Sequence, residues 1–440
     1  MNHNLSSKEI LIIGFMLFAI FFGAGNMIFP PLLGQLAGEN VWIALLGFLL
    51  TGVGLPLLGI IAIAKSGGDL QHLASKVHPT FGIIFSIIMY LAIGPMFGIP
   101  RTGTVSFEVG IKPFLGELSS NGWSLFIYSL IYFSITAWLS LNPSKIVDRI
   151  GKVLTPLLFL VISILIIKAL TTPMGKFTEP NNDYETSPFF RGFLEGYFTM
   201  DTIASLVFGI VLISAIQNKH SLPKKAIMKI CIQAGVIAAI GLAFVYTSLA
   251  YMGAVSVDSI GYFDNGGQIL SGISNTLFGP LGMIILGTAI TFACLTTSIG
   301  LISACSQYFS KLFKISYSKL VLGLSIFSFI VSNVGLTQLI SFSVPVLLMI
   351  YPPAIVLIVL SFFHSLYKNT TYVYRLTLIL TSIVSILDGL AQSKIPFAES
   401  IKEFLLYLPL QSIGIGWVIP ALLGVLIGCV LQMNSRKTTN

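Results

Sequence analysis

Charged residues are scarce in this chain: Asp, Glu, Lys and Arg together make up 9% of its 440 residues. A water-soluble globular protein of this length needs far more polar surface, so the composition excludes that class. Hydrophobic residues make up 55% of the chain and the mean hydropathy is +0.92, which indicates a protein that lies mostly within a lipid bilayer. The net charge of +8 does not indicate nucleic-acid binding, because the basic residues occur in short runs between apolar stretches.

Cysteine and catalytic motifs are scarce as well. Cys231, Cys294, Cys305 and Cys429 fall in apolar stretches at unrelated spacings, which is typical of packing residues and argues against disulfides or a CxxC site. The five histidines form no HExxH motif or paired-ligand spacing, and the chain has no GxxxxGK[ST] loop for ATP. We therefore expect neither an enzyme, nor a resident cofactor, nor a primary pump.

Long apolar runs fill most of the chain instead. Windows of about 20 apolar residues predict an all-α integral membrane protein with twelve transmembrane helices, and no soluble domain interrupts residues 1–440. The predicted helices are 10–37, 41–64, 79–110, 122–141, 146–170, 190–217, 226–252, 279–308, 319–334, 337–363, 371–391 and 411–433.

The basic residues predict the orientation of these helices. With a cytoplasmic N-terminus, 17 Lys and Arg residues fall in the inside segments and 5 in the outside segments. This bias satisfies the positive-inside rule by a wide margin. We therefore expect an even number of crossings, with both termini in the cytoplasm.

The first predicted helix carries an interruption in its middle, in the segment 21–31. Gly23 and Gly25 favour departure from helical geometry, and Pro30 and Pro31 lack amide donors and clash with the preceding turn. Backbone polar groups freed at this depth are tolerated only where they are packed in protein or line a polar cavity. Interrupted helices in corresponding halves of a chain indicate the binding site of a secondary transporter.

A second anomaly lies in the sixth predicted helix, which contains Glu195 and Asp201. Charged groups inside a membrane are rare and usually face a pocket or a partner, so Asp201 is a candidate site residue. Glu195 has the alternative of lying at the membrane interface. Interruptions in helices one and six are what an inverted repeat of five plus five helices produces. The repeats would be 10–170 and 190–363, with 371–433 as two additional helices.

Arg101 and Glu108 are seven residues apart, which places them on one face of the third helix. They form a gate or, equally well, a structural ion pair between helices three and six. An arginine at this depth needs an anion. The candidates are Glu108, Asp201 and the carboxylate of a substrate.

Three groups of motifs carry a family resemblance that covers nearly the whole chain. They are Phe22-Gly23-Ala24-Gly25-Asn26 with Phe29-Pro30-Pro31; Gly94-Pro95 and Ile99-Pro100-Arg101-Thr102 through Glu108; and Glu195-Gly196-Tyr197 with Thr199-Met200-Asp201. With these motifs the chain resembles the branched-chain amino acid to cation symporters of the BrnQ type. That family belongs to the amino acid-polyamine-cation superfamily, and the resemblance implies the leucine-transporter fold.

The substrate site follows from this resemblance together with the residues. The amides where helix one restarts would bind the carboxylate of an amino acid, because they lie at the positive end of a half-helix. Carbonyls near Phe198 and the carboxylate of Asp201 would accept from its ammonium group. An apolar slot would take leucine, isoleucine and valine, which the family implies as substrates. The full expected set is Gly23, Ala24, Gly25, Asn26, Tyr197, Phe198, Met200, Asp201 and Ile203.

A coupling cation has a candidate site in the hydroxyl-rich segment 291–298, because hydroxyl and carbonyl oxygens suit a small, hard cation. The resemblance implies Na⁺, held by Ala19, Phe22, Ala293, Thr296 and Thr297, with a second cation site at Asn26 and Thr199. Proton-driven relatives are expected to carry a lysine in the middle of helix five, and 153–167 contains none.

The interrupted helices predict a secondary active transporter that works by alternating access. The resemblance implies that it takes up branched-chain amino acids with Na⁺, in the membrane of a bacterial cell. A proton-coupled transporter is the first alternative. An ion channel is the second, although channel filters are built from subunit rings or repeated motifs and the two interrupted segments differ completely in sequence.

Overall fold

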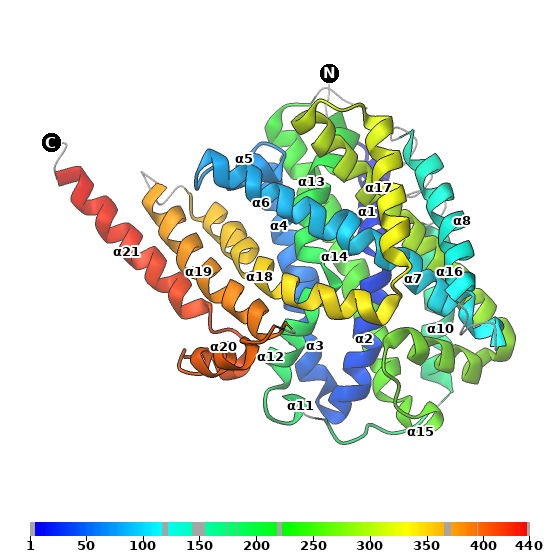
Figure 1. Cartoon of the computed structure of the whole chain (residues 1–440). Helices are drawn as coiled ribbons and strands as arrows, with labels where there is room; N and C mark the ends of the chain where they lie inside the picture. Colours follow the sequence, from blue (N-terminus) through cyan, green and yellow to red (C-terminus); the bar gives the residue numbers. More distant parts are fainter. Residues whose placement is uncertain are drawn as a thin grey trace.

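A computed structural model of the chain describes residues 5–116, 122–142, 155–172, 174–181, 183–217, 222–364, 371–393 and 395–437. All regular structure within these ranges is helical, as the composition predicted (Figure 1). The predicted all-α fold is therefore confirmed for the described part of the chain.

The helices of the first half are α1 (Ser7–Phe21), α2 (Ala24–Ala37), α3 (Val41–Leu49), α4 (Leu55–Ser66), α5 (Leu70–Ala74), α6 (Pro79–Leu91), α7 (Gly98–Gly110), α8 (Gly122–Ser140), α10 (Thr155–Thr171), α11 (Asp183–Thr186), α12 (Pro188–Glu195) and α13 (Asp201–Gln217). Those of the second half are α14 (Lys224–Ala254), α15 (Val257–Ile260), α16 (Gly266–Phe313), α17 (Tyr317–Ser332), α18 (Leu336–Phe362), α19 (Thr371–Ala391), α20 (Ala398–Leu405) and α21 (Val418–Lys437). Short helical turns also occur: η1 (Gly38–Asn40), η2 (Leu50–Gly54), η3 (Ala92–Met96), η4 (Lys112–Phe114), η8 (Gly196–Thr199) and η10 (Gln411–Ile413).

Eight helical stretches of the described residues are long and apolar enough to cross a membrane, and three shorter apolar helices accompany them. The predicted fifth helix, 146–170, is described only from Thr155, because 143–154 lie outside the described residues. The predicted twelfth helix begins later than expected, at Val418 in place of residue 411. The count of twelve crossings stays a prediction.

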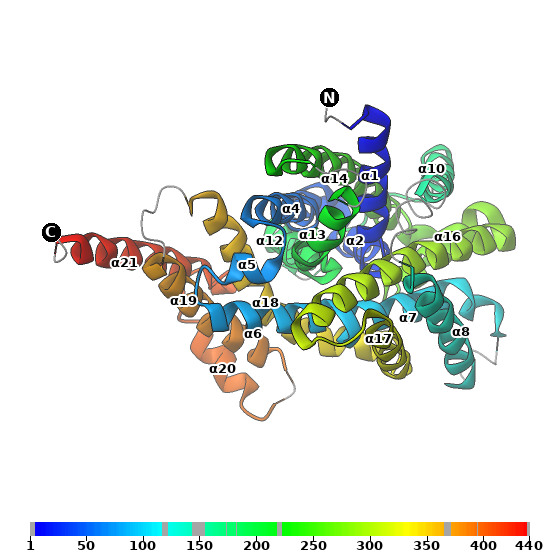
Figure 2. The ribbon, with the colours of Figure 1, turned by 90° about the horizontal axis from the view of Figure 1, so that it is seen from above.

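The arrangement of the helices separates the C-terminal ones from the rest. Figures 1 and 2 both place α19, α20 and α21 to one side of the bundle, where α19 packs between α18 and α21. The start of α1 and the end of α21 lie toward the same end of the bundle as α5, whereas α11 and α15 lie at the opposite end (Figure 1).

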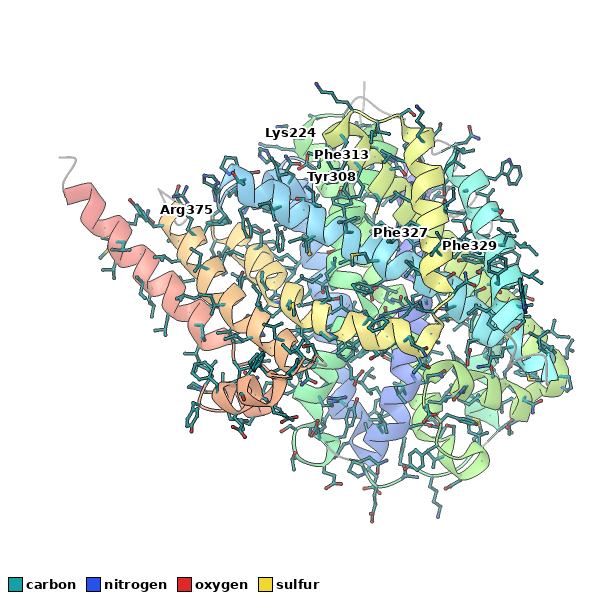
Figure 3. All side chains as sticks on the ribbon, in the orientation of Figure 1. Lys224, Tyr308, Phe313, Phe327, Phe329 and Arg375 are labelled. Carbon is teal, nitrogen blue, oxygen red and sulfur yellow. The ribbon has the colours of Figure 1, made fainter. Side chains whose placement is uncertain are left out.

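The outer surface of the bundle is apolar. Trp138 on α8 is 67% exposed, Ile240 on α14 is 66% exposed and Phe327 on α17 is 48% exposed. Figure 3 labels Phe327 and Phe329 on α17 among the side chains that cover the bundle. Large apolar side chains exposed on so many helices are unfavourable in water and suit the hydrocarbon of a bilayer.

Helices α2 and α14 approach each other through glycine. A Cβ atom on Gly34 would lie 2.0 Å from the carbonyl oxygen of Ala250, and one on Gly253 would lie 2.1 Å from the carbonyl oxygen of Pro31. Small residues allow this backbone approach, which is a common way for membrane helices to associate. The contact matters for the site because α2 and α14 both contribute residues to it.

We expect Gly34→Ala to destabilise the protein, because the added methyl group meets backbone atoms that cannot rotate away. Overpacking of this kind costs about 1–3 kcal/mol in a well-packed core. Thermal unfolding of the purified protein in detergent measures the effect as a lower Tm. Gly323→Ala on α17 is the matched control, because its Cβ would have no atom within 4 Å. An unchanged Tm for Gly34→Ala would contradict the close packing of α2 on α14.

Candidate functional site

The first interruption separates α1 from α2 in the middle of the bundle. Phe22 (φ −71°, ψ 91°) and Gly23 (φ −131°, ψ −153°) are extended, so the helix stops for two residues. The amide of Gly23 donates to Oδ1 of Asn26 at 3.0 Å. The next amides, at the start of α2, have no acceptor inside the helix. The break therefore includes Gly23, as predicted, whereas Gly25 is already the second residue of α2.

The two prolines do not contribute to the break. Pro30 and Pro31 lie inside α2, which continues to Ala37. Because neither proline has an amide hydrogen, the carbonyls of Asn26 and Met27 lose their helical donors, as expected, but the helix itself is not interrupted there. The packing of α2 on α14 and α16 keeps this segment helical despite two missing amide donors.

The second interruption separates α12 from α13, with η8 between them. Met200 follows η8 with φ 68°, a left-handed conformation that residues other than glycine rarely adopt. The hydroxyl of Thr202 donates to the carbonyl of Thr51 at 2.9 Å, and that of Thr51 donates to the carbonyl of Phe193 at 2.8 Å. Thr51 belongs to the π-helical turn η2. This turn is therefore hydrogen-bonded to α12 and to α13, the two helices that flank η8.

A buried polar cluster joins the two interruptions. Nδ2 of Asn26, on α2, donates to both carboxylate oxygens of Asp201, at 2.9 and 2.8 Å. The hydroxyl of Tyr246, on α14, donates to Oδ2 of Asp201 at 2.5 Å and also contacts the Asn26 amide. Asp201 is the first residue of α13, where the helix dipole favours a carboxylate. Side-chain hydrogen bonds therefore connect the break between α1 and α2 to the break between α12 and α13.

The residues expected to hold Na⁺ lie where α1 meets α16. Oγ1 of Thr296 lies 2.9 Å from the carbonyl oxygen of Ala19 and 2.8 Å from that of Ala293. Oγ1 of Thr297 lies 3.4 Å from the Ala19 carbonyl. Four of the five expected residues thus present oxygen atoms within one small region.

Phe22, the fifth expected residue, is extended and buried directly before Gly23. A Cβ atom on Gly23 would lie 2.6 Å from Oγ1 of Thr297, so the break passes closely over α16. The expected cation ligands are therefore adjacent to the start of α2.

The expected second cation pair, Asn26 and Thr199, comes together around Asp201. The amide of Asp201 donates to Oγ1 of Thr199 at 3.4 Å, while the Thr199 hydroxyl donates to the carbonyl of Gly196 at 2.9 Å. Oδ1 of Asn26 accepts from Gly23. Both side chains already have protein partners in this structure.

A small cavity of about 30 Å³ lies between the two interruptions. Six of the nine residues expected to bind substrate line it, namely Gly23, Ala24, Gly25, Asn26, Met200 and Asp201. Thr297 and Thr199 also line it, so it reaches the expected cation residues. Its remaining walls are Ile20, Phe21, Ile93, Gly98, Arg101, Thr102, Ala204, Phe208 and Leu301.

Three of the residues expected to bind substrate are not among those that line the cavity. Tyr197 is buried and stacks on Tyr351, with ring centroids 4.4 Å apart. The carbonyl of Phe198 accepts from Arg101, and its ring packs against Phe29. Ile203 is completely buried in the apolar core. The apolar walls of the cavity come instead largely from side chains of α1, α13 and α16.

Arg101 does not pair with Glu108. Seven residues span about 10 Å along a helix, whereas Lys112 is one turn from Glu108 and bonds it at 2.7 Å. Within the described ranges, Arg101 makes no ion pair with any carboxylate. It donates to the carbonyl of Phe198 at 2.8 Å and to the hydroxyl of Ser343 at 2.6 Å. The expected gate or ion pair of Arg101 with Glu108 is thus replaced by contacts of Arg101 with η8 and α18.

Tyr246 is the main site residue that the sequence analysis missed. A buried tyrosine hydroxyl needs a partner, so its position in the middle of an apolar helix was the available signal. Ile93, Phe208 and Leu301 carried no signal, because they resemble many other apolar residues in membrane helices. Among the described residues, no group of three His, Cys, Asp or Glu side chains could hold a metal ion.

Known proteins resemble this chain over nearly its whole length. A family described as "Branched-chain amino acid transport protein" matches residues 6–435. The branched-chain amino acid permease BraB of Bacillus subtilis (strain 168) is 55% identical over 435 residues, which cover 98% of this chain and 97% of that protein. The permease BrnQ of the same organism is 50% identical over 441 residues, covering 100% of both chains. BrnQ of Escherichia coli (strain K12) is 40% identical, covering 98% and 97%.

Two solved structures resemble the fold. One is a nucleobase-cation-symport-1 family transporter in a closed conformation with bromovinylhydantoin bound. It has a TM-score of 0.63 and 11% identity, and the match covers 98% of this chain and 93% of that one. The other is MhsT in complex with L-phenylalanine, with a TM-score of 0.52, 16% identity and coverage of 98% and 99%. At these identities the likeness concerns the fold alone, which is that of transporters.

Proposed function

We propose that this chain, which belongs to the branched-chain amino acid transport protein family, takes up leucine, isoleucine and valine with Na⁺ by alternating access. It is a multi-pass membrane protein, and its relatives are permeases and not enzymes. The observation that carries the proposal is the polar cluster of Asn26, Asp201 and Tyr246, which joins two interrupted helices beside one cavity.

The walls of the cavity support an apolar amino acid as substrate. The free amides at the start of α2 face a region where a carboxylate gains from the helix dipole. Ile20, Phe21, Phe208 and Leu301 offer apolar contacts to a branched side chain. An apolar wall distinguishes leucine, isoleucine and valine poorly, because one methylene group is worth about 1–3 kcal/mol.

The oxygen atoms between α1 and α16 support Na⁺ as the coupling cation. The carbonyls of Ala19 and Ala293 and the hydroxyls of Thr296 and Thr297 are hard ligands. Because Gly23 lies against Thr297, a bound cation would fix the break beside the cavity. A proton is the alternative, and Asp201 is then the residue to carry it. Glu108 is a weaker candidate because it is paired with Lys112.

The fold proposal comprises twelve crossings, with α1–α10 and α12–α18 as inverted five-helix repeats and α19 and α21 as additional helices. The position of α19–α21 to one side of the bundle supports this division. Both termini point toward the same end of the bundle in Figure 1, which supports an even number of crossings. With the excess of basic residues in the inside segments, we place both termini in the cytoplasm of a bacterial cell.

In the proposed cycle, Na⁺ binds first and orders the extended backbone at Phe22 and Gly23, which raises the affinity for the amino acid. Thermodynamic linkage requires the amino acid to tighten Na⁺ binding by the same factor, typically about 1–3 kcal/mol. Rocking of α1–α4 and α12–α14 against the other helices then opens the cavity to the inside.

Uptake of labelled isoleucine into proteoliposomes tests this function. We expect accumulation with an inward Na⁺ gradient and none with an equal K⁺ gradient or a proton gradient. Liposomes without protein are the control. Accumulation driven only by protons would transfer the coupling role to Asp201. Absence of accumulation under every gradient would contradict the proposed transport of isoleucine. An ion channel, or a transporter of another substrate, would then be the stronger hypothesis.

A further inference from the structure

The cavity between the interrupted helices is lined by a cation and an anion that do not pair with each other. Arg101 is 2% exposed and Asp201 is 1% exposed, and both line the cavity. No ion pair joins them to each other or to any other charged group in the described part of the chain. This is unusual, because removing an ion from water costs several kcal/mol unless a partner compensates it.

Arg101 is held in place by neutral groups. One terminal nitrogen donates to the Phe198 carbonyl and the other to the Ser343 hydroxyl, while the guanidinium carbon lies 5.7 Å from the centroid of the Phe29 ring. Its Nε atom is buried and has no hydrogen-bond partner. The guanidinium is therefore positioned by η8, α18 and α2, and it retains both its full charge and a free donor.

Asp201 is positioned in the same manner. Its oxygens accept from Asn26 and Tyr246, which are neutral, and no lysine or arginine balances its charge among the described residues. Asp201 lies three residues after Phe198, whose carbonyl holds Arg101. Both charges are thus held next to the same turn, η8, each by hydrogen bonds to neutral groups.

We propose that Arg101 and Asp201 recognise the two charges of a zwitterionic amino acid, Arg101 binding the carboxylate and Asp201 the ammonium group. This inference rests on the proposed function and names the groups that select its substrate class. A zwitterion compensates both buried charges at once, whereas an amine or a carboxylic acid leaves one of them unpaired. The amides of α2 then add to the carboxylate contact that Arg101 provides. Sites built for a charged or hydrogen-bonding group reject analogues that lack it much more strongly than apolar walls reject a missing methylene.

Competition against labelled leucine bound to the purified full-length protein tests the proposal. The competitors are 3-methylbutylamine, which is leucine without its carboxylate, and 4-methylpentanoate, which is leucine without its ammonium group. In the unaltered protein we expect both to compete far more weakly than leucine. Arg101→Gln should weaken leucine binding about 10- to 100-fold but leave the amine unaffected. Asp201→Asn should weaken leucine binding by a similar factor but leave the binding of 4-methylpentanoate unchanged.

The matched controls remove the same kinds of charge elsewhere. Arg375, labelled in Figure 3 near one end of α19, donates to the Val77 carbonyl at 3.0 Å, and Asp388 accepts from Gln411 at 2.5 Å. Neither lines the cavity. Arg375→Gln and Asp388→Asn should leave the relative affinities of leucine and its two analogues unchanged. Arg101→Lys, which keeps the charge, provides a second test if Arg101→Gln does not fold, and it should retain the preference for leucine over the amine.

Two results would contradict the proposed roles of Arg101 and Asp201 in substrate recognition. If each substitution lowered the affinities for leucine, the amine and the acid by the same factor, Arg101 and Asp201 would both have a structural role only. If Asp201→Asn changed the Na⁺ requirement but not the preference for leucine over the acid, Asp201 would serve the cation. Failure of the unaltered protein to bind leucine would contradict the proposed function instead. Other amino acids, each compared with its own amine and acid, would then test the charge pair separately.

Discussion

Gly25→Leu should abolish leucine uptake, with a loss of at least about 100-fold. A Cβ atom on Gly25 would lie 3.0 Å from both the Cα and the carbonyl oxygen of Thr199, and 3.3 Å from the carbonyl oxygen of Phe198. These are backbone atoms of η8, so they cannot rotate away from a larger side chain. Gly25 also lines the cavity, and the leucine side chain would enter the space that we propose for the substrate.

Uptake under a Na⁺ gradient measures the effect of Gly25→Leu, and the thermal unfolding curve of the same preparation verifies that the variant is folded. Gly25→Ala should give a smaller loss, because a single methyl group requires only a shift of a few tenths of an ångström. Gly323→Leu is the matched control, since a Cβ there meets no atom within 4 Å. Normal uptake by folded Gly25→Leu protein would place the substrate elsewhere.

The interruptions were predictable from sequence because they break strong local rules. Glycine pairs and a carboxylate are out of place in an apolar span, and this marked Gly23, Gly25 and Asp201 without any knowledge of packing. Pro30 and Pro31 break the same rules and yet lie inside α2. The difference arises from neighbouring helices, whose packing holds the segment helical and is invisible in a single stretch of sequence.

Contacts between distant helices were the part that sequence could not supply. Tyr246 reaches Asp201 from a helix that begins at Lys224, and Arg101 reaches Ser343 across 242 positions of sequence. Helical spacing suggested Glu108 as a partner of Arg101, yet the pair fails because side chains bridge one helical turn more readily than two.

The residues around the second break illustrate a related difficulty. Tyr197, Phe198 and Met200 seemed to belong together because they are adjacent in the chain. The turn η8 and the left-handed Met200 change the direction of the backbone between them. Tyr197 consequently stacks on Tyr351, while Met200 lines the cavity. Helical periodicity therefore cannot assign directions to side chains where the helix itself stops.

The expected cation site yields the second prediction with a large effect. Thr297→Ala should raise the Na⁺ concentration for half-maximal leucine uptake by about tenfold or more, because it removes one of the oxygen atoms that we propose as Na⁺ ligands. The hydroxyl lies 3.4 Å from the Ala19 carbonyl and against Gly23, so its loss affects both the cation and the break beside the cavity. The measurement is uptake at increasing external Na⁺ with the membrane potential held at zero.

Thr297→Ser separates the hydroxyl from the methyl group of the same residue. Serine keeps the oxygen but removes Cγ2, which would lie 2.8 Å from a Cβ on Gly23. If the oxygen binds Na⁺, Thr297→Ser should resemble the unaltered protein while Thr297→Ala does not. If the residue serves only packing, the two variants should behave alike, since both lack Cγ2. An unchanged Na⁺ dependence in Thr297→Ala would move the coupling ion away from α16, and the proton alternative at Asp201 would become the stronger hypothesis.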